Sequence, residues 1–352
     1  MKISILISAL VLVPALALAT VPVEPLVDNA WIKANACNIG VVVLDIRSEK
    51  IDGQAVDDYL KGHVPCAIHT DYHMAGWRTK VEGVPGMLPT VAKLETLIGG
   101  LGIDNATHVV ITPRGNNAKS MGAATRVYWT FKVLGHDKVS ILNGGTEGFA
   151  ANKANTLESG PRDPMPRTFQ AELRQDMLVS RADVQRALND NATLVDYRGP
   201  DQFLGLNRHA KVKRHGTLPG AANLPIEWLT VDNTGRFRSK RGLNEVYRLA
   251  KVPSDQEHIA FCNTGHNSAM GWFVSSELLG RTGVKVYDGS MADWTRQEQP
   301  VIDRRIMLCY NITVKMHRQA LVRRPGYQRL PRRIGSKSRN RLAVMTSRTA
   351  LP

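Results

Sequence analysis

The feature that most constrains this chain is an internal repeat. Four landmarks of the first half return in the second half, in the same order and about 150 residues further on. The matched stretches are Leu44–Arg47 with Leu194–Arg198, His63–Ala67 with Thr217–Ala221, His108–Thr112 with His258–Cys262, and Ile141–Gly145 with Val286–Ser290. Self-similarity at one spacing is the signature of a duplicated structural unit. The sequence therefore predicts two tandem copies of one domain.

Each copy has the pattern of an α/β domain. Short continuous apolar runs, such as Val41–Asp45 and His108–Ile111, are typical of strands buried on both faces of a parallel sheet. Helical segments alternate with these runs. The chain of 352 residues is long enough for two domains, and its apolar fraction of 43% suits packed cores. We expect each copy to form a mostly parallel sheet with helices on both faces.

Changes in composition mark the ends of the copies. Residues 152–167 are rich in Pro, Gly, Asn and charge, as in a linker. We place the first domain at residues 28–151 and the second at residues 168–302. Residues 303–352 show no amphipathic period and are strongly basic, which predicts a disordered basic tail. Contact of this tail with nucleic acid or anionic lipid is an alternative, and so is an aberrant extension of the chain.

The net charge of +15 is distributed very unevenly. Residues 301–352 contribute +12 and residues 1–300 contribute only +3. Because the body of the chain is nearly neutral, its high pI does not indicate a nucleic-acid-binding fold. We expect no nucleic acid partner.

The first residues have the parts of a secretory signal peptide. Lys2 supplies the positive charge, Ile3–Leu18 is a mostly apolar run, and Ala17-Leu18-Ala19 is a small-x-small cleavage site. An anchoring helix is the alternative, but the run is short and contains Pro14. We expect a signal peptide at residues 1–19, export to a bacterial periplasm, and no membrane span in the mature chain.

The chain has four cysteines: Cys37, Cys66, Cys262 and Cys309. Export permits disulfides, but four cysteines are too few for a disulfide-stapled scaffold of this length. Neither a CxxC pair nor a zinc-type spacing is present. We interpret Cys262 as a free thiol and leave the state of the other three open. No metal and no cofactor is expected.

Cys262 stands where a predicted strand meets a predicted helix. The apolar run Ile259–Phe261 ends at this cysteine, Asn263–Ser268 form a loop, and apolar residues recur at helical spacing from Met270. The loop's backbone N–H groups and the helix's positive end favour a thiolate and bound anions. The alternative is a small buried hydrophobic residue. Thr112 occupies the same place in the first copy, so only the second copy can perform thiolate chemistry.

With these motifs the chain resembles the tandem-domain rhodaneses, which are thiosulfate or 3-mercaptopyruvate sulfurtransferases, and among them the exported bacterial branch. The resemblance covers roughly residues 28–302, and its most specific stretch is Phe261–His266. The other landmarks are Leu194–Arg198, Leu218–Pro225 and Tyr287–Trp294. The resemblance implies two rhodanese-like α/β domains, each with a mostly parallel five-stranded sheet. It further implies that the first is inactive and the second catalytic.

The resemblance also implies a mechanism. In this family a cysteine thiolate takes the outer sulfur of a donor, and a thiophile collects it from the resulting persulfide. Cys262 is then the catalytic residue, with a small anionic sulfur donor and a thiol or cyanide acceptor as partners. Gly265 permits the φ that a curled loop needs. The loop residues expected to cradle the sulfur are Asn263, Thr264, Gly265, His266, Asn267 and Ser268.

Three residues near this loop have open roles. His266 either contacts the donor or faces solvent. Asp196 and Arg198 end a predicted strand at the edge where open α/β sheets bind ligands. Either Arg198 holds the anionic donor, or Asp196 and Arg198 form a structural network.

Two positions depart from the animal members of the family. These enzymes carry an Arg where Gln202 stands, and the thiosulfate type carries a Lys where Thr264 stands, whereas the mercaptopyruvate type has a small uncharged residue there. Gln202 is therefore a candidate substrate-binding residue that lacks the family's positive charge. A basic insertion at residues 207–215 either supplies the missing field or is a solvated loop, and its cations include Lys211, Lys213 and Arg214.

Two other functions compete with sulfur transfer. A related phosphatase or arsenate reductase would grip an oxyanion with a Cys-x5-Arg loop, but Ser268 stands where that Arg is required. A non-catalytic persulfide carrier or sulfur-binding scaffold would keep Cys262 without turning over a small molecule. Turnover with thiosulfate or 3-mercaptopyruvate distinguishes an enzyme from such a carrier.

Overall fold

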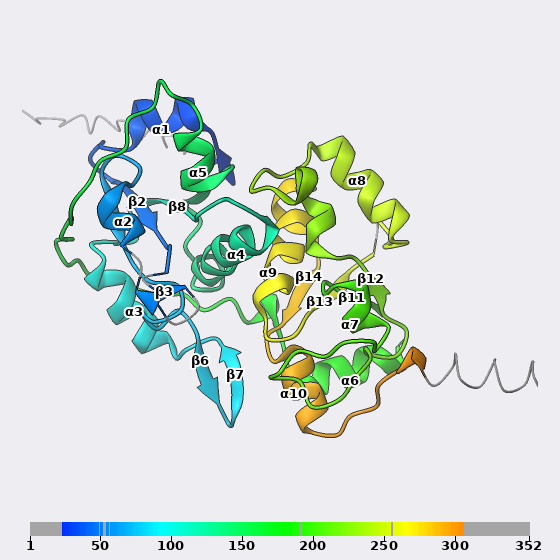
Figure 1. Ribbon diagram of the computed structural model, residues 1–352. Coiled ribbons are helices and arrows are strands. Elements are labelled where there is room, and N and C mark those ends of the chain that lie inside the picture. Colours follow the sequence, from blue (N-terminus) through cyan, green and yellow to red (C-terminus); the bar gives the residue numbers. More distant parts are fainter. Residues whose placement is uncertain are drawn as a thin grey trace, which may run out of the picture. The chain divides into compact units, whose positions relative to one another are not determined.

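The computed structural model describes residues 23–305 apart from residues 49, 52, 53, 56, 191 and 255. Figure 1 shows the two sheets and the helices around them. The expected signal peptide, Cys309 and the tail beyond residue 305 lie outside the described residues.

Two five-stranded sheets repeat one topology. Their orders are β1-β9-β8-β2-β5 and β10-β14-β13-β11-β12, so each strand of the first sheet has a counterpart at the same place in the second. Every neighbouring pair in both sheets is parallel. The first sheet consists of β1 (Leu26–Val27), β2 (Val41–Asp45), β5 (Ala67–His69), β8 (His108–Thr112) and β9 (Val139–Leu142), and the second of β10 (Leu178–Val179), β11 (Thr193–Asp196), β12 (Ala222–Asn223), β13 (His258–Phe261) and β14 (Val284–Tyr287). The predicted duplication and the predicted parallel α/β fold are confirmed.

Helices cover the sheets (Figure 1). The first domain has α1 (Asn29–Asn35), α2 (Asp58–Lys61), α3 (Val91–Gly100), α4 (Ala118–Val133) and α5 (Gly145–Ala150). The second has α6 (Arg181–Asn189), α7 (Pro200–Phe203), α8 (Lys240–Leu249), α9 (His266–Trp272) and α10 (Ser290–Arg296), with short turns at Gln175–Met177, Ile226–Leu229 and Val231–Asn233 and a π-helical turn at Phe273–Leu278. In the part of the chain that the structure describes, no helix is both long and apolar enough to cross a bilayer.

Helix α4 of the first domain packs against α9 of the second. One hydrophobic cluster contains buried side chains of both helices, among them Met121, Trp129 and Met270. The hairpin of β6 (Thr79–Val81) and β7 (Val84–Met87) also extends from the first domain to α10 of the second (Figure 1). Since apolar burial drives association, the two domains share a core.

The register of the second sheet places two predicted functional residues at one edge. Asp196, the last residue of β11, pairs with Phe261, the last residue of β13. Cys262 follows directly, so Asp196 and the cysteine both lie at the carboxyl ends of their strands. This is the edge at which open α/β sheets bind ligands.

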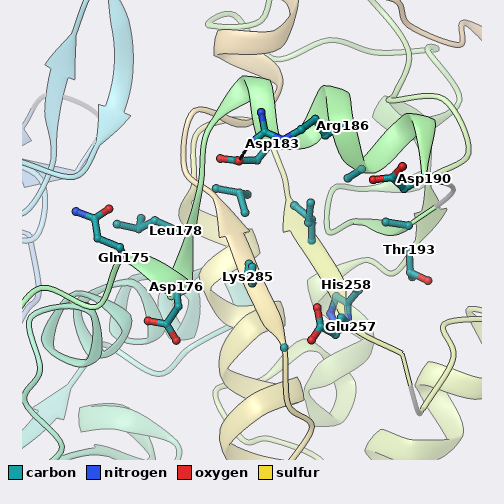
Figure 2. Close-up of a pocket in the computed structure, with 15 residues that line it drawn as sticks. Gln175, Asp176, Leu178, Asp183, Arg186, Asp190, Thr193, Glu257, His258 and Lys285 are labelled. Atoms are coloured by element: carbon teal, nitrogen blue, oxygen red, sulfur yellow. Dashed lines mark hydrogen bonds and ion pairs between the residues drawn. The ribbon is translucent and has the colours of Figure 1, made fainter.

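The amino ends of the same strands border a different cavity, of about 530 Å³ (Figure 2). Its lining includes His258 at the start of β13 and Lys285 near the start of β14. It also includes Asp176, Asp183, Asp190 and Glu257 but no thiol. This cavity therefore lies at the edge opposite Cys262.

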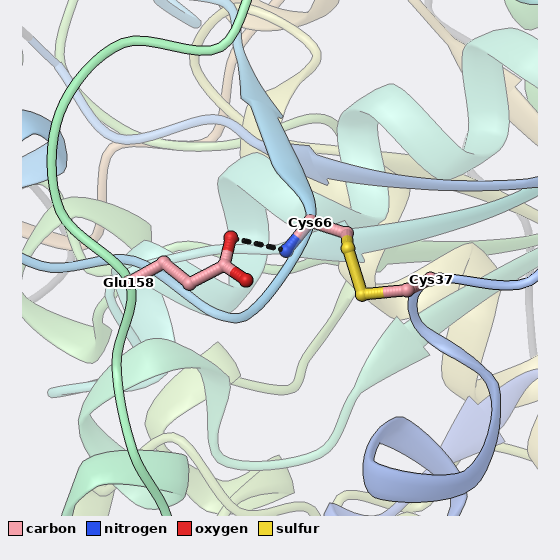
Figure 3. A group of neighbouring side chains, drawn as sticks. All are labelled: Cys37, Cys66 and Glu158. Atoms are coloured by element: carbon pink, nitrogen blue, oxygen red, sulfur yellow. Dashed lines mark hydrogen bonds between the residues drawn. A yellow bond between two sulfur atoms is a disulfide. The ribbon is translucent and has the colours of Figure 1, made fainter.

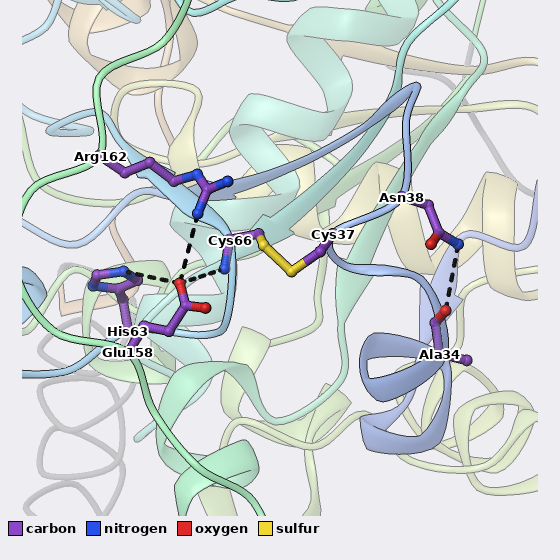
Figure 4. The surroundings of a disulfide bond; sticks show 7 residues. All are labelled: Ala34, Cys37, Asn38, His63, Cys66, Glu158 and Arg162. Carbon is purple, nitrogen blue, oxygen red and sulfur yellow. Dashed lines mark hydrogen bonds and ion pairs between the residues drawn. A yellow bond between two sulfur atoms is a disulfide. The ribbon is translucent and has the colours of Figure 1, made fainter.

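A disulfide joins Cys37 and Cys66, whose Cα atoms are 5.4 Å apart (Figure 3). It connects the segment after α1 to the turn before β5. The Cys66 N–H donates to Glu158 Oε2 at 2.8 Å. Arg162 and His63 face the same carboxylate at 3.8 and 3.9 Å (Figure 4). The state of these two cysteines, which the sequence left open, is thus a cross-link at the amino edge of the first sheet.

The predicted linker lies along the first domain. Glu158 and His63 exchange backbone hydrogen bonds of 2.8 and 2.9 Å. Further on, the Arg167 N–H donates to the Gly99 carbonyl at 2.8 Å. A Cβ atom on Gly99 would lie 2.5 Å from the Arg167 oxygen, so the close approach of these two segments requires glycine.

Candidate active site

Cys262 lines a cavity of about 450 Å³ at the carboxyl edge of the second sheet. Cys262 is only 2% exposed. It is the one free cysteine among the described residues, as predicted. Side chains of both domains form the walls. The first domain contributes His73, Arg78 and Lys119, and the second contributes Arg198, Gln202, His209 and Lys211 beside the cysteine loop.

The loop after Cys262 is shorter than predicted. It spans only Asn263–Gly265, because α9 already begins at His266. Gly265 is the N-cap residue with φ +76°, so the predicted need for positive φ is confirmed. A Cβ atom there would lie 2.5 Å from both Arg126 Nη1 and Asp288 Oδ1. His266, Asn267 and Ser268 were predicted as loop but form the first turn of the helix, since Gly265 turns the chain three residues earlier.

Two serine hydroxyls lie within reach of the sulfur. Ser268 Oγ, in the first turn of α9, is 3.5 Å from Cys262 Sγ, and Ser290 Oγ is 3.9 Å away. The positive N-terminal end of α9 also faces the sulfur, because Ser268 belongs to the first turn of this helix. The Ser268 hydroxyl, as a donor, and a helix N-terminus both favour the charged form of a sulfur atom.

Ser290 holds the shape of the loop. Its Oγ accepts the N–H groups of Cys262 at 3.1 Å and of Gly265 at 3.3 Å, and it donates to the Tyr287 carbonyl at 2.8 Å. Ser290 has φ +49°, a conformation that costs free energy for a residue with a side chain. Gly265 therefore directs its N–H to Ser290 rather than toward the sulfur. The landmark Tyr287–Trp294 was noticed in the sequence, but nothing in it identified this bond.

The amide side chains of the loop are anchored in the second domain. Asn263 Nδ2 donates to Gln202 Oε1 at 2.9 Å, and Asn267 Nδ2 donates to the Tyr197 carbonyl at 3.2 Å. Asn263, Asn267 and Gln202 all line the cavity. Gln202 thus supports the loop through its side-chain oxygen.

Asp196 and Arg198 form a buried network. Arg198 Nε donates to Asp196 Oδ1 at 2.9 Å, and Arg198 Nη2 donates to Asp196 Oδ2 at 2.6 Å and to the Gly216 carbonyl at 2.9 Å. The first domain, whose two described cysteines form a disulfide, repeats these contacts with Arg47, Asp45 and Gly62. Because the copy without a thiol keeps the network, its role is structural. Arg198 nevertheless lines the cavity, whereas Asp196 is fully buried.

Arg78 of the first domain contacts the cysteine loop directly. Its Nη2 donates to the Thr264 carbonyl at 2.7 Å and to Thr264 Oγ1 at 3.0 Å. Its Nε donates to the Gly86 carbonyl at 3.2 Å, which ties the β6–β7 hairpin to the same point. Thr264 is 7% exposed and lines the cavity.

His266 links the two domains. Tyr72 Oη lies 2.7 Å from His266 Nδ1, and His266 Nε2 lies 3.0 Å from the Lys119 carbonyl. Since a carbonyl can only accept, we assign the proton to Nε2, so that Nδ1 accepts from the Tyr72 hydroxyl. Burial, followed by the nearby Arg78, lowers the pKa of His266 to about 3. The side chain is therefore neutral at pH 7, and it is half-buried at the cavity wall rather than solvent-facing.

Only one cation of the insertion reaches the cavity. Lys211 lines it, whereas Lys213 and Arg214 do not. The Lys213 N–H donates to Thr295 Oγ1 at 2.9 Å. Arg214 Nη1 donates to the carbonyls of Glu298 and Gln299 at 3.2 and 3.0 Å. Each alternative for the insertion is thus only partly right. Lys211 adds positive charge to the cavity, whereas Lys213 and Arg214 lie outside it and contact other residues of the second domain.

Sequence reasoning missed the residues that the first domain contributes. They are Tyr72, His73, Arg78, Lys119 and Arg126, and they contact or face the cysteine loop from another domain. Since the described part of the first domain has no free cysteine, no motif in it pointed to the site. The packing of α4, of the segment between β5 and β6, and of the β6–β7 hairpin against the second domain brings these side chains there.

Comparisons with known proteins agree with this geometry. The rhodanese-like domain family matches residues 28–152 and 180–297. The chain is 33% identical to thiosulfate sulfurtransferase of Cricetulus griseus over 285 residues, which are 78% of this chain and 93% of that protein. It is 34% identical to thiosulfate sulfurtransferase of Rattus norvegicus over 251 residues, which are 70% of this chain and 82% of that protein.

Solved structures share the fold. SseA of Escherichia coli, a 3-mercaptopyruvate sulfurtransferase, superposes with a TM-score of 0.66 at 26% identity, covering 76% of this chain and 98% of that one. Tum1 of Saccharomyces cerevisiae, at 20% identity and a TM-score of 0.67, shares the fold over 81% of this chain and 99% of its own. Both copies of the repeat thus match one family, and relatives that span most of the chain are sulfurtransferases. The chain belongs to the rhodanese family, with two tandem rhodanese-like domains, and it is a sulfurtransferase.

Proposed function

We propose that this enzyme moves a sulfane sulfur from a small anionic donor to a thiophilic acceptor through a persulfide on Cys262. The observation that carries the proposal is the position of this free thiol, which lines a cavity whose walls hold cations of both domains. Relatives named thiosulfate sulfurtransferase and 3-mercaptopyruvate sulfurtransferase support those two compounds as candidate donors.

The first step is attack of the Cys262 thiolate on the outer sulfur of the donor. With thiosulfate, a new S–S bond forms to Cys262 while the donor's own S–S bond breaks, and its electron pair leaves with sulfite. With 3-mercaptopyruvate, the C–S bond breaks and pyruvate leaves as an enolate that takes up a proton. Either reaction leaves Cys262 as a persulfide.

The second step returns the enzyme to its starting state. Cyanide attacks the outer persulfide sulfur, the S–S bond breaks, and thiocyanate leaves while the thiolate re-forms on Cys262. A thiol acceptor reacts in the same way and departs as its own persulfide. No oxidant or reductant is required, because the sulfur moves between two nucleophiles.

The residues around Cys262 fit both sulfur anions. The Ser268 hydroxyl lies 3.5 Å from Sγ and can donate to a thiolate, whereas the Ser290 hydroxyl, 3.9 Å from Sγ, donates its one proton to the Tyr287 carbonyl. The first turn of α9 adds its positive end. Because these groups are already in place, they stabilise the charged sulfur without reorganisation.

We further propose that the enzyme acts outside the cytoplasm, after removal of residues 1–19. The Cys37–Cys66 disulfide supports an oxidising compartment, because such bonds persist mainly in exported proteins. N-terminal sequencing of the protein recovered from a periplasmic fraction tests this proposal. A cytoplasmic protein that starts at Met1 would contradict it.

Cyanolysis assays test the function. We expect thiocyanate from thiosulfate or from 3-mercaptopyruvate, with the parallel double-reciprocal lines of a double-displacement reaction, and no thiocyanate from Cys262→Ser. If neither donor gives thiocyanate above the level of Cys262→Ser, the proposed function is wrong. A persulfide that forms but is never released to cyanide or a thiol would instead indicate a carrier.

A further inference from the structure

Three cations of the cavity wall have no carboxylate partner. Arg78 donates only to the carbonyls of Gly86 and Thr264 and to the Thr264 hydroxyl. Lys119 and Lys211 form no side-chain ion pair within the described residues, and both are exposed to the cavity. Arg78 and Lys119 belong to the first domain, whereas the reactive thiol belongs to the second.

The other charged groups of the wall do not cancel these cations. Arg198 is held by Asp196. Asp201 and Glu227 also line the cavity, and Asp201 Oδ2 accepts a hydrogen bond from Asn207 Nδ2 at 2.9 Å. Two carboxylates thus face three unpaired cations, and the remaining charge of the space is positive.

The three cations act on the same space. His73 and His209 both line the cavity, and partial burial lowers the pKa of each. The fields of Arg78, Lys119 and Lys211 lower both pKa values further, and Arg198 adds to the effect on His209, while Asp71 raises the pKa of His73. An anion bound between these two histidines is therefore attracted by all three cations.

The chemical groups that carry the positive charge determine which anions the cavity favours. Arg78 already uses Nε and Nη2, and Arg198 uses the same two atoms, so neither offers a free guanidinium fork to a planar carboxylate. Lys119 and Lys211 offer ammonium groups, which are compact point charges. Separate point charges match the sulfonate end of thiosulfate, whose double negative charge is spread over a tetrahedral group.

We propose that Arg78, Lys119 and Lys211 bind the sulfonate end of a dianionic donor of the thiosulfate type. This inference rests on the proposed function and names the substrate class of the same cavity. Gln202 and Thr264 also line the cavity but carry no charge, so these three cations supply its unpaired positive charge. The first domain, which has no thiol of its own, supplies two of the three.

The lysines allow a clean test, because neither contacts the loop through its side chain. Lys119→Gln and Lys211→Gln are each expected to raise the KM for thiosulfate about fivefold, the effect of one unit charge at close range in a solvated site. The double variant should raise it more than tenfold, with kcat nearly unchanged. Lys213→Gln is the matched control, since it removes the same charge from the same insertion outside the cavity. The KM for 3-mercaptopyruvate should change less than that for thiosulfate.

Calorimetric titration of thiosulfate into Cys262→Ser protein separates this inference from the proposed function, because it needs no turnover. Weaker binding once Lys119→Gln or Lys211→Gln is added supports the inference, even if the wild-type enzyme forms no persulfide. Unchanged binding in both lysine variants overturns it, even if the persulfide forms normally. A loss for Lys213→Gln as large as for Lys211→Gln, or an equal loss for 3-mercaptopyruvate, would also overturn it.

Discussion

Arg126 Nη1 lies 2.5 Å from Asp288 Oδ1, and this ion pair joins the two domains next to the cysteine loop. The same nitrogen donates to the Gly265 carbonyl at 3.0 Å. Asp288 Oδ2 accepts the Leu88 N–H at 2.6 Å, so the segment after the β6–β7 hairpin meets the pair as well. Arg126 is fully buried. The loop that positions Cys262 is therefore held by a residue of the domain that has no thiol.

Removing this arginine should destabilise the protein strongly. Arg126→Gln leaves the buried Asp288 without its charge partner, and breaking a buried pair in this way typically costs about 3–5 kcal/mol. We expect a correspondingly lower free energy of unfolding in urea. Arg186→Gln is the control, because the side chains of Arg186 and of its partner Asp183 are 69% and 36% exposed. The urea midpoint of this variant should equal that of the wild type. Equal midpoints for the two variants would show that the buried pair contributes little.

The first domain should remain inactive even when it is given a thiol. Thr112 is fully buried and lines neither of the two cavities described above. It is followed by Pro113, which has no N–H to offer an anion. We therefore expect that Thr112→Cys in the Cys262→Ser background gains no sulfur from thiosulfate, as measured by intact mass. A mass gain of one sulfur in this double variant would mean that the two copies differ only in the cysteine.

These contacts show what could be read from the sequence and what could not. The strands and the positive φ of Gly265 follow from local patterns, and the repeat follows from matching motifs in the two halves of the sequence. The structure confirms all three. Tyr72, Arg78 and Arg126 could not be assigned, because their roles depend on which face of the first domain meets the second. The predicted loop, Asn263–Ser268, was three residues too long, because Gly265 in the left-handed conformation caps the helix that begins at His266.

Three histidines should make stability depend on pH. Burial is the main cause that lowers the pKa of His108 and of His258 to about 4, and of His266 to about 3. Between these values and the usual 6.5 the unfolded chain binds protons that the folded chain does not, so stability is lost as the pH falls from about 6.5 to about 4.

Urea unfolding at pH 7 and at pH 5 measures this dependence above the range in which most carboxylates titrate. His258, the most deeply buried of the three after folding, should account for about 2 kcal/mol of the difference. The more exposed His108 should account for less. His258→Gln should therefore show a smaller difference between the two pH values than the wild type. The same difference in both proteins would exclude His258 as a source.

The disulfide should contribute to stability but not to catalysis. Cys37 and Cys66 are 29 residues apart, and closing a loop of that size stabilises a fold by roughly 3–4 kcal/mol. The double variant Cys37→Ser/Cys66→Ser should lose about that much free energy of unfolding. Its kcat/KM should stay unchanged, because the bond lies at the amino edge of the first sheet. Wild-type protein treated with a reductant is the control and should match the variant. A large fall in kcat/KM at a temperature where the variant is folded would contradict this separation.

The most direct test of sulfur transfer through Cys262 is the intact mass of the protein after brief treatment with thiosulfate, followed by peptide mapping. We predict a gain of one sulfur atom on the peptide that contains Cys262, its loss when cyanide is added, and no gain in Cys262→Ser. An unchanged mass with both thiosulfate and 3-mercaptopyruvate, or a gain that persists in Cys262→Ser, would contradict the account.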